Sequence, residues 1–101
     1  MEVTHATWPG DGKLGRCRAG EYRGWFALFT AEIEDFWIVY LASVTPGRET
    51  QYDDFSTRGD AQMQRLIEEF DVEWFAPSDE VVLEEEVFGL RSHWRAEGHL
   101  K

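Results

Sequence analysis

Residues 36–45 constrain the fold most strongly, because this segment is apolar on both of its sides. Its aromatic and β-branched residues predict a β-strand. Alternate side chains of a strand point to opposite faces of the sheet. One face receives Phe36, Ile38, Tyr40, Ala42 and Val44, and the other receives Trp37, Val39 and Leu41. A strand with one wet face would alternate apolar and polar residues, so we expect this one to be central, with both of its faces covered.

A second strand is expected at residues 22–30, which are also rich in aromatic side chains. Residues 31–35 suit a hairpin connection between the two strands, with Glu34 and Asp35 at its tip. Glycine and proline predict a turn at residues 9–15, and residues 48–55 are expected to form an acidic, aromatic loop. The central element is therefore an antiparallel hairpin.

A helix is expected at about residues 57–70, with Ser56 or Thr57 as its N-cap. The helical spacing of its apolar residues produces one continuous stripe, formed by Met63, Leu66, Ile67 and Phe70. A short strand at about residues 72–75 follows this helix. These elements together indicate an α+β fold in which a small antiparallel sheet is packed by a helix.

The C-terminal quarter of the chain allows two interpretations. Ser78-Asp79-Glu80 is a good helix start, and four later apolar residues keep helical spacing: Leu83, Val87, Leu90 and Trp94. We therefore predict a helix at about residues 79–95. Valines favour a strand and Gly89 interrupts a helix, so a strand at residues 81–88 that pairs with residues 72–75 is the alternative.

The length of 101 residues predicts a single domain, residues 1–101. Cys17 is the only cysteine, so no internal disulfide can form and a cytoplasmic location is the expectation. No signal peptide is recognised at the N-terminus. The longest apolar stretch, residues 36–42, is much shorter than the roughly 20 residues of a membrane-spanning helix.

Charge is the strongest functional signal in the sequence. Twenty acidic and ten basic residues give a formal net charge of −10, and thirteen of those acids lie in residues 51–101. Residues 66–90 contain nine acids and no lysine, arginine or histidine. A field of this sign speeds encounter with a basic partner. It argues against direct binding to nucleic acid or to an anionic membrane.

No catalytic, metal or cofactor site is predicted, and we do not expect an enzyme. His93 and His99 lack the i, i+4 spacing of a helical zinc pair, and Cys17 has no CxxC partner. The run Gly10 to Gly15 superficially resembles a phosphate-binding loop. It lacks the serine or threonine after Lys13 and the helix that such a loop requires.

The predicted partner-binding residues combine carboxylates with an aromatic side chain. Acids that surround aromatic residues are typical of protein interfaces, where tyrosine and tryptophan act as anchors. The best single candidate is the 52–55 segment, Tyr-Asp-Asp-Phe, on a loop. The full candidate set is Tyr52, Asp53, Asp54, Glu34, Asp35, Glu84, Glu85 and Glu86.

Three functions are compatible with these features. The favoured one is an immunity protein or antitoxin that neutralises a basic, nuclease-like toxin domain, because nucleases are basic. The chain is similar in size and charge to small acidic bacterial immunity proteins, although no motif carries that resemblance. The alternatives are a homodimeric assembly module that buries a spare apolar sheet face and a DNA mimic that blocks a nucleic-acid-binding protein.

Overall fold

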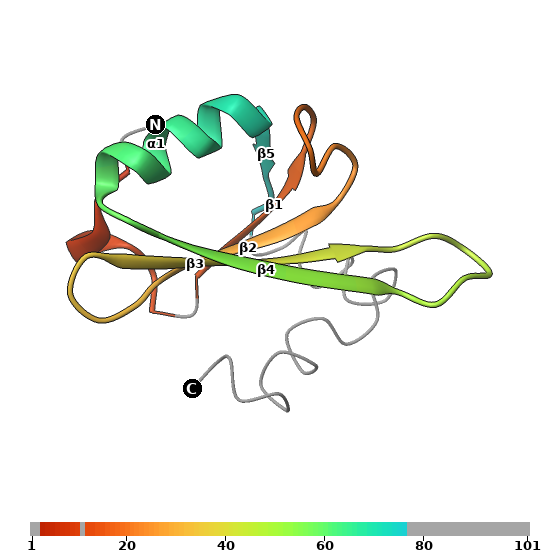
Figure 1. Ribbon diagram of the computed structural model, residues 1–101, viewed down its shortest axis with the longest axis horizontal. Coiled ribbons are helices and arrows are strands. Elements are labelled where there is room, and N and C mark those ends of the chain that lie inside the picture. The colour runs from red at the N-terminus through yellow and green to blue at the C-terminus, as the bar shows by residue number, and fades with distance from the viewer. Residues whose placement is uncertain (1–2, 11, 77–101) are drawn as a thin grey trace.

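The computed structural model describes residues 3–10 and 12–76 of the chain, which form a five-stranded antiparallel sheet and one helix packed against it (Figure 1). The strand order across the sheet is β4-β3-β2-β1-β5. The helix α1 spans Asp60–Phe70, and a short 3-10 helix, η1, spans His5–Thr7. The strands are β1 (Lys13–Cys17), β2 (Phe26–Ala31), β3 (Phe36–Ser43), β4 (Gln51–Arg58) and β5 (Val72–Trp74).

The predicted hairpin is confirmed, but its first strand begins at Phe26, because residues 22–25 belong to the connection from β1. Strands β2 and β3 pair antiparallel, with Phe26 opposite Ala42 and Ala31 opposite Trp37. The connection turns through Glu34, whose φ of 61° lies in the left-handed region. Strand β3 has a neighbour on each side, so it is an interior strand as its two apolar faces predicted.

Two strands were not predicted. The glycine-rich segment expected to be only a turn at residues 9–15 leads directly into β1, which pairs with both β2 and β5. The segment expected to be an acidic loop at residues 48–55 is largely strand β4, which pairs along its whole length with β3. Both predictions failed because the local patterns are weak: β1 contains a glycine and β4 is mostly polar, although each pairs with a strand adjacent to it in the sequence.

The predicted helix is confirmed, but its start is not. It begins at Asp60, and the residue before it is Gly59, at φ 89° and ψ 142°, without a side-chain cap. This backbone conformation is accessible to glycine and turns the chain from β4 into α1. Ser56 and Thr57 belong to β4 instead of capping the helix. The predicted short strand after the helix is confirmed as β5.

Helix α1 links the two opposite edges of the sheet and therefore crosses one of its faces, as Figure 1 shows. We call this face the helix side. The predicted apolar stripe is confirmed, with Met63, Ile67 and Phe70 buried and Leu66 partly buried against them. The sheet contributes the buried residues Cys17, Ala27, Phe29, Trp37, Val39, Leu41 and Val72 to this core.

The N-terminal segment closes one end of the helix-side core. Trp8 is buried, and its indole N–H donates to the carbonyl of Phe29 at 2.8 Å. The ring of Trp8 meets that of Trp37 edge to face at a centroid distance of 5.1 Å. The His5 ring lies within hydrogen-bond distance of the Phe36 carbonyl, so this histidine has a structural role.

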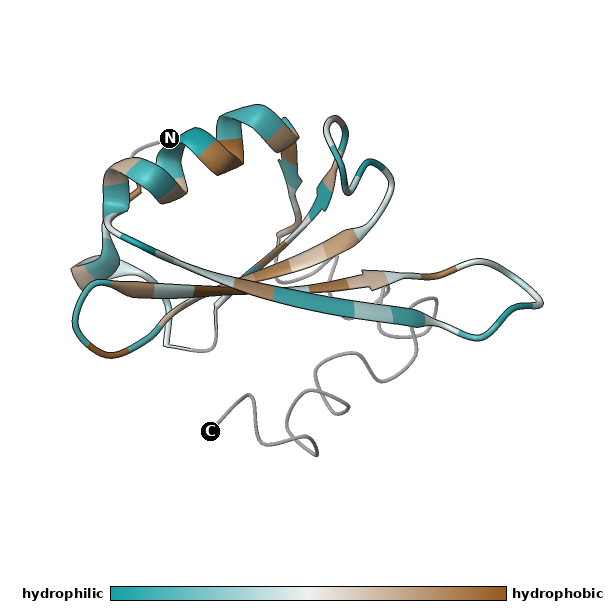
Figure 2. Ribbon diagram, viewed as in Figure 1, coloured by the Kyte–Doolittle hydropathy of each residue, from teal (hydrophilic) through white to brown (hydrophobic). Residues whose placement is uncertain are grey.

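The opposite side of the sheet, which we call the second face, is also apolar. Figure 2 shows β2 and β3 mainly in the brown of hydrophobic residues and much of β4 in teal. No helix or strand among residues 3–10 and 12–76 packs on this face. Its buried residues are Leu14, Phe26, Leu28, Tyr40 and Ala42, with Ile38, Val44 and Phe75 packed against them.

The predicted C-terminal helix at residues 79–95, and its strand alternative at residues 81–88, lie outside the described residues. In the part of the chain that the structure does describe, no helix is both long and apolar enough to cross a membrane.

Candidate functional site

The candidate residues Tyr52, Asp53 and Asp54 lie on the edge strand β4. We expected them on a loop, and this was wrong, because residues 51–58 continue the sheet beyond β3. All three side chains are exposed, with 39% of Tyr52 accessible to solvent. The strand ladder holds these side chains in fixed positions, which a loop would not do.

The register divides these three residues between the two faces of the sheet. Asp53 is opposite Leu41 and therefore lies on the helix side. Tyr52 is opposite Ala42 and Asp54 is opposite Tyr40, so both lie on the second face. The two aspartates thus project from opposite sides of the same edge strand.

Asp53 accepts two hydrogen bonds. The hydroxyl of Tyr22 donates to its Oδ2, and the backbone N–H of Asp54 donates to its Oδ1 at 2.8 Å. Tyr22 comes from the β1–β2 connection, where its ring stacks on Phe55 and meets Phe70 edge to face. Through these contacts Tyr22 joins the β1–β2 connection to both β4 and the end of α1.

The hydrogen bond from the Asp54 N–H to the Asp53 carboxylate engages a backbone donor at the open edge of the sheet. The N–H of Gly59 donates to the Asp35 carbonyl, so this pair is a hydrogen-bonded pair of the antiparallel ladder. Such pairs alternate with non-bonded pairs, and counting along the register makes Tyr40–Asp54 a non-bonded pair. The backbone N–H and carbonyl of Asp54 therefore point away from β3, and the N–H donates to the Asp53 carboxylate.

Two tyrosines are sensitive to the negative potential around β4. The hydrogen bond to Asp53 raises the pKa of Tyr22 to about 12, with help from burial and from the charges of Asp53, Glu21 and Asp54. Burial raises the pKa of Tyr40 to about 12, and the charges of Glu32 and Asp54 add to this effect. Burial also raises the pKa of Tyr52. We call Glu21, Glu32, Asp53 and Asp54 the β4 acidic surface.

The sequence prediction had found only part of this surface. Glu21 and Glu32 were not in the candidate set: Glu21 precedes Tyr22 in the β1–β2 connection, and Glu32 follows β2 and acts on Tyr40. Residues 51–58 carry a signal for an edge strand, because Phe55 is the one apolar anchor among polar and β-prone neighbours. If that strand had been recognised, its alternation would have placed Asp53 and Asp54 on opposite faces of the sheet.

Glu34 and Asp35 lie in a different place. They occupy the β2–β3 turn, at the end of β4 where Arg58 is opposite Phe36. The Arg58 guanidinium is 3.4 Å from the Asp35 carboxylate and lies over the Phe36 ring. Asp54 is four residues along β4 from Arg58, about 13 Å away. The predicted set is therefore not one patch, and Glu84, Glu85 and Glu86 lie outside the described residues.

Some acids of the second half are paired with an arginine of the chain itself. The Arg18 guanidinium lies 3.0 Å from the Asp71 carboxylate and 3.9 Å from that of Glu73. Glu68 and Glu69 are exposed on α1. Among the residues that the structure describes, the members of the β4 acidic surface form no such ion pair. This distinguishes them from Asp35, Asp71 and Glu73.

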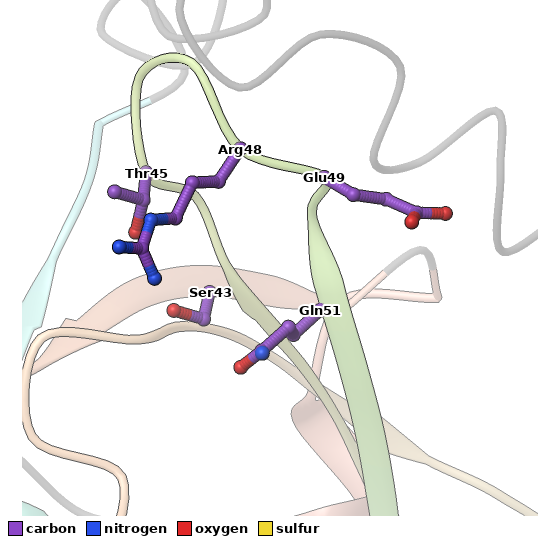
Figure 3. A pocket seen from close by; sticks show the side chains of 5 residues that line it. All are labelled: Ser43, Thr45, Arg48, Glu49 and Gln51. Carbon is purple, nitrogen blue, oxygen red and sulfur yellow. The ribbon is translucent and has the colours of Figure 1, made fainter.

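A small hollow lies beside the β3–β4 connection. Its volume is about 290 Å³, and it is lined by Ser43, Thr45, Arg48, Glu49 and Gln51 (Figure 3). Figure 3 shows the Arg48 side chain extending toward Ser43, with the Glu49 carboxylate pointing away. This lining is polar but contains no histidine, cysteine or other evident base beside its hydroxyl groups, so it offers no activated nucleophile.

The one cysteine of the chain, Cys17, lies in the described core. Cys17 is buried in the helix-side core, and burial raises the pKa of its thiol to about 11, which disfavours the reactive thiolate. Within residues 3–10 and 12–76, no three histidine, cysteine, aspartate or glutamate side chains are grouped so that they could hold a metal ion.

No protein-family model, curated protein or solved structure matches this chain. The assignment of a candidate site to this protein is therefore based on the geometry and charge of its own residues.

Proposed function

We propose that this protein is a small acidic inhibitor that binds a basic protein partner, in the manner of an immunity protein or antitoxin that blocks a nuclease-like toxin domain. The observation that carries this proposal is the position of Asp54. Its side chain is exposed on the same face of β4 as Tyr52, and no described lysine or arginine pairs with it. Within the described residues, this stretch of the edge strand therefore carries negative charge without a basic partner.

The charge of this edge favours a particular class of partner. Nucleases that bind phosphates present positive surfaces, and complementary charge raises the rate of association with such a surface. Exposed Tyr52 lies two residues from Asp54 on the same face of β4, where it supplies the aromatic contact that interfaces often use as an anchor. The negative charge of Asp54 and the aromatic ring of Tyr52 therefore lie next to each other on one face of β4.

The rigidity of the site supports inhibition by occlusion. Strand β4 is paired with β3 over eight residues, and the Tyr22–Asp53 hydrogen bond ties it to the β1–β2 connection. A pre-organised surface loses little conformational entropy on binding, which favours a tight complex. We expect the partner to contact both sides of this edge, because Asp53 and Asp54 project from opposite faces.

A DNA mimic is less well supported by this arrangement. Duplex DNA presents about one charge per 1.7 Å of its axis. Here Asp53 and Asp54 lie on opposite faces, and Asp35, Asp71 and Glu73 are each close to an arginine. No observation among the described residues places the carboxylates in a row of that kind.

The test is a charge reversal at Asp54 with a matched reversal on α1. The binding probe is a basic toxin domain encoded beside the gene for this chain. We expect Asp54→Lys to slow association with that domain about tenfold or more at low salt. Glu69→Lys changes the net charge equally but lies on the exposed side of the helix, so its effect should be much smaller. Stopped-flow association at several salt concentrations measures both rates.

Two results would contradict the proposal. Equal effects of the two substitutions would show that only total charge matters and that the β4 edge is not the site. Association that is slow and insensitive to salt would remove the steering role of the acids. Circular dichroism of both variants verifies that the fold is retained.

A further inference from the structure

We propose that the basic partner binds by adding one of its own extended segments to the open edge of β4, as a further strand of the sheet. This inference rests on the proposed function, because it specifies how the partner would contact the same edge. An extended segment can bind a sheet edge through backbone N–H and carbonyl groups that no neighbouring strand uses. Strand β4 must therefore present a row of such groups to solvent.

Alternate residues of β4 direct their backbone groups away from the sheet. The N–H of Glu32 donates to the Phe36 carbonyl, so every second residue of β3 from Phe36 onward bonds to β2. The residues of β3 between them bond to β4, and each is opposite an odd-numbered residue of β4. The even-numbered residues of β4 therefore direct their N–H and carbonyl groups outward, and they include Asp54, Ser56 and Arg58.

The outward groups near the end of β4 are available for pairing. Asp54, Ser56 and Arg58 are all exposed. The N–H of Asp54 donates to the Asp53 carboxylate, but the outward N–H groups of Ser56 and Arg58 donate to no residue within 3–10 and 12–76. Residues two apart in a strand are separated by about 6.8 Å, which is also the spacing at which an extended segment offers its carbonyl groups.

Strand β4 lacks several of the features that keep a sheet edge from pairing. Natural edges are often short, interrupted by a bulge, or marked by proline or lysine. Strand β4 has eight residues with neither proline nor lysine, and its register with β3 runs without a bulge. The opposite edge strand, β5, has only three residues. Of the two edges, β4 is therefore the one suited to strand addition.

The charges along β4 determine which kind of segment can pair with it. Like charges on neighbouring strands are destabilising, whereas opposite charges stabilise a cross-strand pair. Asp54 projects from the second face and Asp53 from the helix side, so an added strand meets a carboxylate on either face. The Arg58 guanidinium is 3.4 Å from the Asp35 carboxylate, so this cation already has an anionic neighbour. The segment that fits best is extended and carries a lysine or arginine beside Asp54.

A second copy of the chain fits this edge less well than a basic segment does. Each copy carries a formal charge of −10, so association would bring two strongly negative chains together. Two β4 strands paired antiparallel about Ser56 would set Arg58 of each copy beside Asp54 of the other. Exposed ion pairs of this kind contribute little, and Arg58 already contacts Asp35, so the attraction is small against the repulsion between whole chains.

Two synthetic peptides with the same side chains test strand addition on the full-length protein. Each alternates lysine and threonine over the length of β4, and the control peptide carries N-methyl groups on two adjacent central residues. Successive N–H groups of a strand point to opposite edges, so the control loses a donor on both edges without a change in charge. We expect the control to bind about tenfold more weakly, the loss typical of one hydrogen bond.

Amide hydrogen exchange measured by NMR locates the bound peptide. The unmodified peptide should slow the exchange of the Ser56 and Arg58 amides, whose N–H groups point outward. The Thr57 amide is the internal reference, because it already bonds to β3 in the free chain and should change little.

A pair of substitutions at Ser56 tests the same donor from the side of the protein. Ser56→Pro removes an outward N–H that the ladder with β3 does not use, and proline is tolerated at such edge positions. The matched control, Ser56→Ala, keeps the N–H and removes only the hydroxyl group. We expect Ser56→Pro to weaken binding of the unmodified peptide about tenfold and Ser56→Ala to leave it unchanged. Circular dichroism verifies that both variants fold, and the peptide comparison does not depend on them.

The outcomes separate strand addition from the proposed function. Equal binding of the two peptides, no binding of either, or unchanged exchange of the Ser56 and Arg58 amides would overturn strand addition. Protection of these amides in the free chain that increases with protein concentration would show a second copy at the edge, and this too would overturn it. Association of the toxin domain with Asp54→Lys is a separate measurement, so a failure there counts against the proposed function.

Discussion

Asp53 shows how one side chain can protect a sheet edge and shape its charge. An edge strand exposes unpaired backbone groups that can pair with another chain. The Asp53 carboxylate accepts the outward N–H of Asp54 and so occupies one of these donors. It also accepts the Tyr22 hydroxyl, which holds the carboxylate in place. The carboxylate of Asp54 remains exposed on the other face of the sheet.

The Tyr22–Asp53 contact predicts a specific loss of stability at alkaline pH. The folded-state pKa of Tyr22 is raised from 10.0 to about 12, so the folded chain holds this proton more tightly than the unfolded chain does. The resulting stabilisation is complete below pH 10 and is lost as the pH rises toward 12. We expect the free energy of unfolding of the wild-type chain to fall more steeply over this range than that of Tyr22→Phe.

Urea denaturation at closely spaced pH values measures both curves. Tyr40 and Cys17 also have raised pKa values, but they titrate in both chains, so the difference isolates Tyr22. At neutral pH we expect Tyr22→Phe to be less stable by about 1 kcal/mol, the typical net contribution of one hydrogen bond. Parallel curves across pH 10–12 would show that the hydrogen bond does not persist in solution.

At the scale of elements, β1 depends on the absence of a side chain at Gly15. A Cβ at this position would lie 2.6 Å from the Val72 Cγ1 atom and 2.8 Å from the Glu73 carbonyl oxygen. Both neighbours belong to β5, where Gly15 pairs with Trp74. The glycine that made this segment resemble a turn therefore permits the close approach of two strands.

This close approach predicts unequal effects for alanine substitutions at Gly15 and at Gly10. Gly15→Ala should destabilise the chain by about 1–3 kcal/mol, because β5 must move to accept the new methyl group. Gly10→Ala introduces the same group where no atom lies within 4 Å, and it should change stability by less than about 0.5 kcal/mol. Thermal or urea unfolding compares the two. Similar stabilities would show that β5 does not pack on β1 as described.

The hairpin and helix were predictable because their signals are local. The continuous run of aromatic and β-branched residues from 36 to 44 identified β3 and its two apolar faces, and the spacing of Met63, Ile67 and Phe70 identified α1. Strand β1 lacks such a signal because glycine weakens it, and β4 carries only the weak signal of Phe55 among polar side chains. The candidate site was predicted as a list of acids, but which of them act together depends on the register of β4.

At the scale of the whole molecule, the net charge of −10 opposes the compact state. Among the residues that the structure describes, the ion pairs engage Arg18 and Arg58, and they relieve this repulsion only locally. Self-repulsion between distant exposed acids is screened by salt, whereas attraction within an ion pair is weakened by it. The direction of the salt effect therefore reports which of the two dominates.

We expect salt to stabilise this protein. Between about 10 mM and 150 mM sodium chloride the Debye length falls from roughly 30 Å to 8 Å. The free energy of unfolding should rise by roughly 1 kcal/mol, an order-of-magnitude expectation for screened charges near a surface. Glu69→Lys reduces the net charge by two units and should gain less from the same salt. Chemical denaturation at both concentrations measures this, and a loss of stability with salt would contradict the expectation.

The sequence by itself determined the elements whose apolar patterns are complete within one segment, along with the overall charge and the α+β class. Only the tertiary structure showed that residues 51–58 form the edge strand β4, that β1 pairs with β5, and that Asp53 and Asp54 lie on opposite faces of the sheet. The reason is that a strand at an edge, or one containing glycine, has a weak apolar pattern of its own and is specified by the partner strand that it meets. For β1 one such partner, β5, is distant in the sequence; for β4 the partner is the preceding strand β3, but the faces of the sheet exist only after the two have paired.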